Sequence, residues 1–418
     1  MKIIGNIWWF LGWYVFLYPF ALSIVWSILG FYFWWRRERN PDKEKKEWPN
    51  LWPPVTILIP CHNESAGIAS ICTSLQLLNY PDYQVIFIDD ASTDDTAAAI
   101  RHFLPDNPNF HLLSLTKNCG KAQALNYALA TVVTASITVV IDADTILTPD
   151  ALKYLVAPFS SQPRLGAVTG NPLAVKRISI LEKLQAAEFA SIIGLIKRSQ
   201  RVIGRVLTVS GCATAYRTEV LKEVGGFSFK TATEDIDITW KIQRHFYEVW
   251  FAPQAAVFIQ CPSTFKEYWK QRRRWALGGW HLLRTHKDIF KNLKWRYLYP
   301  TYLEFVLSTF WAFVFVFGTI YWLITYFLKL SPIGFSPIPA WYGALISIVC
   351  IFQMAIALFL NHRYDPKLYR TFFWIPWYPI FFFAFGAITI VWTAPKGLFG
   401  SLENVGRWKS PKRQVANS

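Results

Sequence analysis

Charged residues are scarce in this chain. They make up 17% of its 418 residues, whereas 53% are hydrophobic, and a typical soluble domain carries about 25% charged residues. An intrinsically disordered chain is excluded, because so much apolar surface is available for burial. A purely soluble protein is excluded as well, because the apolar residues collect toward the two ends of the chain.

Metal-binding cysteine patterns and acidic residues are also few. No two of the six cysteines form a Cys-x-x-Cys pair, and no histidine stands at zinc-finger spacing from them. We therefore expect small buried thiols in a reducing compartment. Lys and Arg number 43 against 27 Asp and Glu, a net charge of +16. No nucleic-acid-binding motif accompanies this excess, so we expect no nucleic acid partner and attribute the charge to anionic lipid headgroups and an anionic nucleotide substrate.

The N-terminal apolar segment predicts a membrane protein. No charge occurs between Lys2 and Arg36, so residues 1–36 exceed the roughly 20 residues that cross a bilayer. The basic linker at residues 37–50 marks the cytoplasmic side of this span. The N-terminus should therefore lie outside the cell membrane, and the soluble part that follows the linker should lie in the cytoplasm.

The C-terminal third predicts further membrane segments. Residues 262–298 interleave Lys and Arg with Trp, as amphipathic helices in the membrane interface do. Residues 299–395 form a transmembrane region of about three apolar stretches, at 300–328, 339–360 and 372–394. Pro376 and Pro379 favour a broken or re-entrant last stretch. Three full crossings would place the C-terminus outside, whereas the basic tail at 396–418 favours the inside, and the sequence leaves this choice open.

The central part, residues 51–261, alternates short apolar runs with helical patterns. Such alternation predicts an α/β domain with a mostly parallel, covered sheet. Ligands of these sheets bind beyond the carboxyl ends of the strands, where the polar residues of this segment fall. The expected strands are Val55–Pro60, Gln84–Asp90, Phe110–Leu115, Ile137–Asp142, Leu165–Thr169, Leu207–Tyr216 and Val249–Ile259, with helices such as Lys121–Thr131 and Glu234–His245 between them.

Carboxylates follow several of the predicted strands. The first strand ends before Asn63 and Glu64, and the second ends in Asp89 and Asp90. An ordinary helix cap by Ser92 or Thr93 is the alternative to a ligand site at the second cluster. After the fourth strand, alternation points Asp142 and Asp144 the same way. Paired oxygens suit Mg²⁺ or Mn²⁺, which would bridge a diphosphate and neutralise the leaving group.

Three further groups of residues complete the candidate site. Lys121 opens a helix, where a phosphate binds well, and a surface lysine is the alternative. Glu234 and Asp235 open another helix, either as first-turn acids or with Asp235 as a general base. The run Gln271-Arg272-Arg273-Arg274-Trp275 lies in the interfacial segment. An arginine of this run that faces the active site would bind pyrophosphate. For Arg272 and Arg273, the alternative is that they bind lipid headgroups.

The order of these groups resembles a known family. Asp90, Asp142-x-Asp144, Thr233-Glu234-Asp235 and Gln271-x-x-Arg274-Trp275 are similar to the motif set of the processive, inverting, membrane-embedded glycosyltransferases, the group of cellulose, chitin and hyaluronan synthases. A narrower resemblance, to bacterial poly-β-1,6-N-acetylglucosamine synthases, is carried by Val168–Pro172, Glu188–Gln200, Thr208–Gly211, Thr233–Ile238 and Tyr18-Pro19-Phe20. Two segments depart from it: Asp89–Ser92 replaces an expected Asn-Asp-Gly-Ser, and Arg407–Arg413 replaces Trp-x-Ser-Pro-Asp-Arg-Gly.

The resemblance implies an α/β GT-A catalytic domain of the nucleotide-diphospho-sugar transferase type, with interfacial helices and α-helical transmembrane segments. It implies processive, inverting transfer of N-acetylglucosamine from UDP-N-acetylglucosamine to a growing β-linked polysaccharide of the biofilm matrix. Synthesis would be coupled to export at the bacterial cytoplasmic membrane, with the lipid bilayer and a small membrane accessory subunit as partners.

The resemblance also implies a role for each matching residue. Asp235 would be the general base, and Glu234 would help to orient the acceptor. The nucleotide sugar would bind to Asn63, Glu64, Asp90, Lys121, Asp142, Gln271 and Arg274. The acceptor would bind to Ser210, Gly211 and Trp275, and the metal, Mg²⁺ or Mn²⁺, to Asp142 and Asp144.

Three alternatives remain open from the sequence. Another processive synthase, making hyaluronan, chitin or a glucan, would use the same residues. A non-processive glycosyltransferase that makes a glycolipid would share the metal and the base, but has less need for Gln271, Arg274 and Trp275. A non-enzymatic transporter or lipid-binding scaffold would leave the acidic groups at successive strand or helix ends unexplained.

Overall fold

The computed structural model describes residues 2–40, 48–330, 334–336, 341–378 and 380–402. The chain forms two compact units. The sheet unit consists mainly of Trp35–Arg177 and Ile203–Cys261, and the membrane-helix unit consists of Met1–Trp34, Ile178–Val202 and Pro262–Gly400. Part of the predicted linker and most of the predicted basic tail, including Arg407–Arg413, lie outside the described residues.

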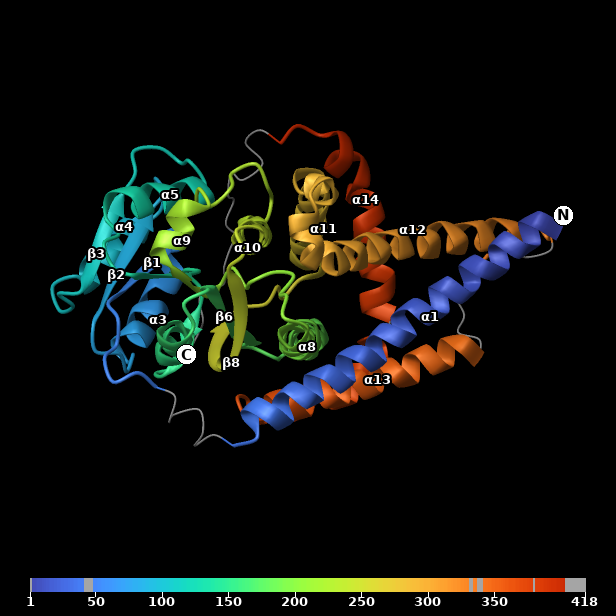
Figure 1. Cartoon of the computed structure of the whole chain (residues 1–418), viewed down its shortest axis with the longest axis horizontal. Coiled ribbons are helices and arrows are strands. Elements are labelled where there is room, and N and C mark those ends of the chain that lie inside the picture. The colour runs from blue at the N-terminus through green and yellow to red at the C-terminus, as the bar shows by residue number, and fades with distance from the viewer. Residues whose placement is uncertain (1, 41–47, 331–333, 337–340, 379, 403–418) are drawn as a thin grey trace. The chain divides into compact units, whose positions relative to one another are not determined.

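One mixed sheet of eight strands forms the centre of the sheet unit, in the order β3-β2-β1-β4-β7-β6-β8-β5. Strands β1, β2, β3, β6 and β8 are labelled in Figure 1. The strands are β1 Val55–Cys61, β2 Tyr83–Asp89, β3 Phe110–Ser114, β4 Ile137–Ile141, β5 Ile146–Leu147, β6 Leu165–Ala174, β7 Ala213–Arg217 and β8 Glu248–Ile259. Strands β1 to β4 pair in parallel, as do β6 and β8. Strand β7 runs antiparallel to both of its neighbours, and β5 runs antiparallel to β8.

Helices cover both faces of this sheet. They are α3 Ser65–Gln76, α4 Thr96–Phe103, α5 Lys121–Thr131, α6 Ala151–Ser161, α9 Thr218–Glu223 and α10 Glu234–Arg244. Successive side chains of β1 point to opposite faces: Ile57 and Ile59 pack in one apolar cluster with α3 and α6, and Leu58 packs in a second cluster with α5, α9 and α10. Because both faces are buried, the central strands are continuous apolar runs.

The predicted strands agree with the observed ones within a few residues at most ends, except for Leu207–Tyr216. The observed strand β7 begins only at Ala213. The preceding backbone amides bond to side chains instead of to a neighbouring strand: Val209 donates to Thr239 Oγ1 at 2.9 Å, and Ser210 donates to Thr169 Oγ1 at 2.7 Å. The first half of the predicted strand is therefore a loop at the edge of the sheet.

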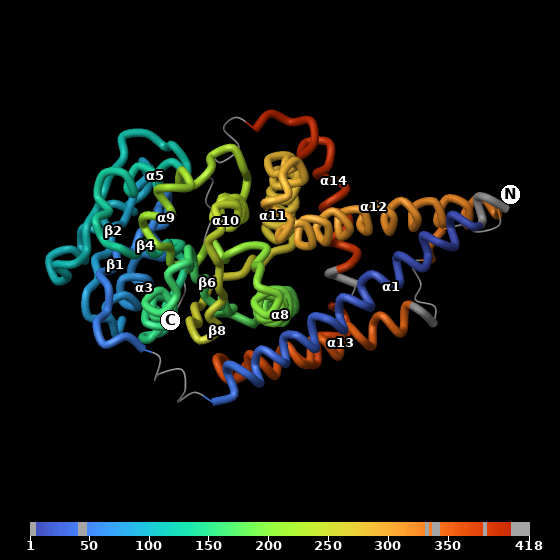
Figure 2. Tube along the Cα trace, viewed as in Figure 1, coloured from blue at the N-terminus to red at the C-terminus, as the bar shows by residue number. Residues whose placement is uncertain are grey.

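The membrane-helix unit holds the long apolar helices. Its elements are α1 Lys2–Phe33, α7 Ile180–Glu188, the π-helical turn η2 Phe189–Leu195, α8 Ile196–Ile203, α11 Phe265–Thr285, η3 Lys287–Lys291, η4 Leu293–Leu298, α12 Tyr299–Phe327, α13 Trp341–His362, η5 Pro366–Trp377, η6 Ile380–Phe385 and α14 Gly386–Phe399. Helices α1 and α13 lie side by side although they are far apart in sequence, as the chain trace shows (Figure 2).

Three helices of the described residues are long and apolar enough to cross a membrane: Asn6–Glu38, Leu293–Phe327 and Gly343–His362. The last predicted stretch, residues 372–394, is divided among η5, η6 and α14. Its apolar helix, Phe383–Phe399, is shorter than the three others. Of the two prolines on which the predicted break rests, Pro376 lies inside η5 and Pro379 lies outside the described residues.

Candidate active site

The polar segments after β1, β2 and β4 meet where these strands have their carboxyl ends, which we call the carboxyl edge of the sheet. These strands are parallel and in register, with Cys61 opposite Asp89 and Val55 opposite Ile137. Their carboxyl ends therefore lie next to one another, and the residues that follow them come together as the sequence predicts.

Asp90 holds the loop that leads into α5. Its side chain is buried, and its two carboxylate oxygens accept hydrogen bonds from the backbone amides of Cys119 and Gly120, each at 2.8 Å. Gly120 has a φ of 87°, a backbone conformation that residues with a Cβ rarely adopt. Asp90 thus fixes the turn that sets the start of α5, in addition to any contact with a ligand.

His62 and Asn118 extend this arrangement, and the predicted set of site residues lacks both. His62 Nδ1 lies 2.9 Å from the carbonyl oxygen of Asp90, and the amide nitrogen of Asn118 lies 3.0 Å from His62 Nε2. A carbonyl can only accept, so Nδ1 carries the proton and Nε2 accepts from Asn118. The signal for His62 was its place between the first strand and Asn63, whereas nothing local pointed to Asn118.

Asn63 and Glu64 connect the first two loops of the edge. Asn63 is exposed, and its side-chain oxygen accepts from the backbone amide of Thr93 at 2.8 Å. Glu64 is buried, and its backbone amide donates to Thr96 Oγ1 at 2.8 Å. Helix α4 begins at Thr96, and Asp94 accepts from its amide at 3.0 Å. Asp94 thus accepts a hydrogen bond from the first residue of this helix. The alternative in which Ser92 or Thr93 caps the helix is wrong, because α4 begins only at Thr96.

Lys121 lies at the centre of the edge. Its ammonium nitrogen is 2.6 Å from Asp142 Oδ1 and 2.9 Å from Glu234 Oε1, and it donates to the carbonyl of Gly211 at 3.4 Å. The side chain of Lys121 is only 14% exposed. Burial acts to lower the pKa of Lys121, but the two carboxylates outweigh it and raise the pKa above the usual value of lysine. The lysine is therefore charged, and the alternative of an ordinary surface lysine is wrong.

Asp235 begins the same helix as Glu234 and faces the loop before β7. A Cβ placed on Gly211 would lie 3.1 Å from Asp235 Oδ2, a tight contact, so the carboxylate lies close against the loop at this glycine. Asp235 Oδ1 accepts from the backbone amide of Ile236 at 3.0 Å, and the positive end of the helix favours its charge. Ser210, adjacent to Gly211, is held by the hydrogen bond that its backbone amide donates to Thr169 Oγ1. Gly211 thus lies against the Asp235 carboxylate, and Ser210 is its neighbour in the chain.

Asp144 follows β4 two residues after Asp142, and both side chains are half-buried. No group of three or more His, Cys, Asp and Glu suited to a metal occurs among the described residues. Mg²⁺ typically takes one or two carboxylates from a protein and completes its shell with waters and substrate phosphates. Two carboxylates at the sheet edge fit this kind of ion.

Gln271, Arg274 and Trp275 lie on α11 in the membrane-helix unit. Their spacing of three and four residues places them on one side of that helix. The side-chain oxygen of Gln271 is buried and finds no hydrogen-bond partner in the part of the chain that the structure describes. Arg274 is exposed and Trp275 is half-buried.

Arg272 and Arg273 differ from each other. Arg272 is 9% exposed and bonds through both terminal nitrogens to the carboxylate of Glu188, at 2.6 Å each. Arg273 is exposed. The lipid-headgroup alternative is therefore wrong for Arg272, because its guanidinium is engaged inside the protein. The basic run itself contains no signal that separates these neighbours.

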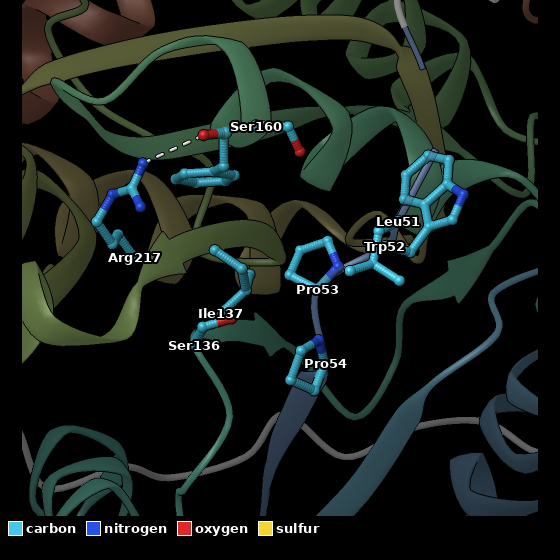
Figure 3. A pocket seen from close by; sticks show the side chains of 9 residues that line it. Leu51, Trp52, Pro53, Pro54, Ser136, Ile137, Ser160 and Arg217 are labelled. Carbon is cyan, nitrogen blue, oxygen red and sulfur yellow. Dashed lines mark hydrogen bonds between the residues drawn. The ribbon is translucent and has the colours of Figure 1, made fainter. Parts of the chain in front are cut away.

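A pocket of about 440 Å³ lies elsewhere on the sheet unit (Figure 3). Its lining includes Pro53 and Pro54, which precede β1, together with Ser136 and Ile137, at the start of β4. These are the amino ends of the strands, opposite the edge that holds Asp90 and Asp142. Arg217 donates from its Nη2 to the carbonyl of Phe159 there at 3.3 Å. No predicted site residue lines this pocket.

The mixed sheet, with a lysine and several carboxylates at the carboxyl ends of its strands, agrees with the predicted GT-A fold. The model of the glycosyltransferase-like family 2 matches residues 53–278, and the chain belongs to this family. The chain is thus a glycosyltransferase. A mannosyltransferase from Pyrobaculum calidifontis, solved in complex with GDP-Man and Mn²⁺, has a similar fold, with a TM-score of 0.54 and 21% identity over 92% of this chain and 99% of that one.

Two relatives are similar over nearly the whole chain. The poly-β-1,6-N-acetyl-D-glucosamine synthase of Staphylococcus epidermidis is 32% identical over 407 residues, which cover 96% of this chain and 98% of that protein. The synthase of the same name from Staphylococcus aureus strain COL is 33% identical over the same shares. The narrower resemblance seen in the sequence is thereby confirmed.

We predict that Lys121→Gln destabilises the sheet unit in a pH-dependent way. The change leaves Asp142 and Glu234 facing each other without the shared cation, at a cost of about 1–3 kcal/mol. Carboxyl groups take up protons at about pH 4, which removes the repulsion, so the loss should be larger at pH 8 than at about pH 3. The melting temperature of the detergent-purified protein at both pH values measures this loss of stability, and Arg101→Gln, at an exposed position, is the control. An equal loss at both pH values contradicts the prediction.

Proposed function

We propose that this glycosyltransferase polymerises N-acetylglucosamine from UDP-N-acetylglucosamine into poly-β-1,6-N-acetylglucosamine, processively and with inversion, and couples synthesis to export. The observation that carries the proposal is the group of Asp235, Gly211, Lys121, Asp142 and Glu234, because it joins a candidate base to a cation at the carboxyl edge of the sheet. The full-length similarity to two synthases of this polymer supports the choice of sugar and linkage.

Asp235 is the proposed general base. The acceptor hydroxyl gives its proton to the Asp235 carboxylate while its oxygen attacks the anomeric carbon of the donor. The bond from that carbon to the diphosphate breaks, and its electron pair leaves with UDP. Attack comes from the face opposite the leaving group, so an α-linked donor gives a β-linkage. Ser210 and Gly211 bind the acceptor in this proposal, since Gly211 lies beside Asp235 and Ser210 directly precedes it.

The donor occupies the strand ends in this proposal. Asp90, with Asn63 and Glu64, forms the nucleoside side, where the lone pairs that the amides of Cys119 and Gly120 leave on Asp90 accept from uracil or ribose. Lys121 contacts the diphosphate in this proposal, and Glu234 orients the lysine through their ion pair.

Two further groups neutralise the diphosphate in this proposal. Asp142 and Asp144 hold Mg²⁺ or Mn²⁺, and the ion, when bound, stabilises the charge that develops on the leaving UDP. Gln271 and Arg274 bind the diphosphate from α11, and the exposed guanidinium of Arg274 is free to take part in this contact.

The membrane segments give the polymer its path in this proposal. Trp275 lies under the terminal sugar of the acceptor, where a flat indole supplies contact without fixed hydrogen bonds. The basic residues after the first span support a multi-pass protein of the bacterial cytoplasmic membrane with its catalytic domain in the cytoplasm. A small membrane accessory subunit completes the proposed assembly.

The product of the reaction tests the proposed function directly. Membranes that contain the enzyme should incorporate label from UDP-N-acetylglucosamine, and from no other nucleotide sugar of a panel, into a polymer. A glycosidase specific for β-1,6-linked N-acetylglucosamine should digest that polymer. Label transferred to a single-sugar glycolipid, or a polymer resistant to this glycosidase, would contradict the proposal.

Asp235→Asn should abolish the base and keep the size of the side chain. We expect polymerisation to fall about 10²- to 10⁴-fold, while UDP binding, measured by calorimetry, stays near that of the wild type. Glu219→Gln, which makes the same chemical change at an exposed position, is the matched control. Polymer synthesis by Asp235→Asn at the wild-type rate would rule out Asp235 as the base.

Metal removal should stop the reaction. We expect a chelator to abolish transfer and Mg²⁺ or Mn²⁺ to restore it, because the diphosphate needs a counter-charge as it leaves. Asp144→Ala should lose transfer and should also lose the gain in UDP affinity that the metal gives the wild type, as measured by calorimetry. Full activity in chelator, or an unchanged metal effect on UDP binding in Asp144→Ala, would contradict the assignment.

A further inference from the structure

Glu188 and Arg272 form a buried ion pair whose geometry also fixes the orientation of the arginine side chain. Glu188 ends α7 and Arg272 lies on α11, and the two side chains meet through two parallel hydrogen bonds of 2.6 Å. Glu188 is 3% exposed and Arg272 is 9% exposed. A bidentate pair of this kind fixes the plane of the guanidinium, which a single contact to a lysine does not.

The fixed guanidinium is flanked by two aromatic rings of its own helix. Its central carbon lies 4.5 Å from the centre of the Tyr268 ring and 4.4 Å from the centre of the Trp275 ring. Tyr268 precedes Arg272 by four residues and Trp275 follows it by three, so the three side chains form one stripe along α11. Each contact is within the range of a cation–π interaction.

Stability alone is a weak explanation for this pair. A buried ion pair costs desolvation, and apolar residues of the same volume often serve stability equally well. Here the carboxylate also belongs to the residue directly before the π-helical turn η2, and such turns are frequent at functional sites. Glu188 contacts Arg272, and Arg272 contacts Trp275. Trp275 is the side chain that binds the acceptor in the proposed function.

We propose that Glu188 and Arg272 are positioning residues that hold the indole of Trp275 in the orientation that receives the acceptor sugar. This inference rests on the proposed function for the role of Trp275. Arg272 touches neither donor nor acceptor in it, and acts only through the indole. The opposite view is that the pair merely joins α7 to α11, in which case its loss affects the enzyme independently of Trp275.

A double-mutant cycle separates the two views. Arg272→Lys keeps the positive charge but removes the planar guanidinium and its two parallel hydrogen bonds to Glu188. In full-length enzyme in membranes, we expect it to raise the ratio of donor hydrolysis to sugar transfer about 3- to 30-fold, and to shorten the polymer, with UDP affinity unchanged. In the Trp275→Ala background, the same change should have no further effect. Arg273→Lys, at the exposed neighbouring position, is the matched control and should leave both readouts unchanged.

A spectroscopic measurement tests the contact without relying on activity. In enzyme labelled with 5-fluorotryptophan, the ¹⁹F resonance of Trp275 is the one that Trp275→Phe removes. It should shift in Arg272→Lys and in Glu188→Gln, and stay in place in Arg273→Lys. If Arg272→Lys fails to fold, the double variant Glu188→Gln/Arg272→Gln, which removes both charges together, replaces it in the cycle and in the spectrum.

Three outcomes overturn the inference: an unmoved Trp275 resonance, an equal effect of the Arg272 change in both backgrounds, or normal transfer by Trp275→Ala. Its failure is distinguishable from that of the proposed function. A different polymer in the nucleotide-sugar panel overturns the proposed function, while the cycle and the resonance still decide whether Arg272 positions Trp275. Coupling in the cycle together with a shifted resonance supports the inference whichever sugar is polymerised.

Discussion

The shared ammonium group of Lys121 holds together the parts of the sheet unit that matter for its chemistry. It joins the end of β4, through Asp142, to the start of α10, through Glu234, and it begins α5 itself. Without the cation the two partly buried carboxylates would repel each other, and water screens such repulsion less well there than in bulk solvent. The position of Asp235 depends on the same pairing, because it is the next residue along α10.

The loops around this cation are held by side chains that bond to backbone. The side chains of Asp90, Asn63 and Thr169 accept hydrogen bonds from backbone amides of these loops. The donors are Gly120, Thr93 and Ser210, respectively. Loop amides that are removed from water need such partners, since an unpaired buried amide costs as much as a lost hydrogen bond. These bonds form the edge before any substrate arrives, and a site formed in advance has less reorganisation to undergo during the reaction.

The membrane-helix unit follows the same rule with side chains from distant helices. Arg198 and Asn361 are fully buried and meet at 3.3 Å, and Gln353 donates to Ser191 at 3.1 Å. Gly194, in the π-helical turn, leaves room for the amide of Asn361. Polar groups buried among apolar helices must bond to one another, so these contacts, together with Glu188 and Arg272, determine how α7, η2 and α8 pack against α11 and α13.

Much of this protein follows from the sequence by itself. Continuous apolar runs predict the central strands, and the long charge-free segments predict the apolar helices, because both signals are local. The carboxyl-edge position of Asp90 and Asp142 follows from the same strands. The tertiary structure alone decided that Glu234 pairs with Lys121, that Asn118 meets His62, and that Arg272 is buried while Arg273 is exposed. Hydrophobic periodicity tells which side of an element is apolar, but the partner of a charge depends on which distant element packs against it.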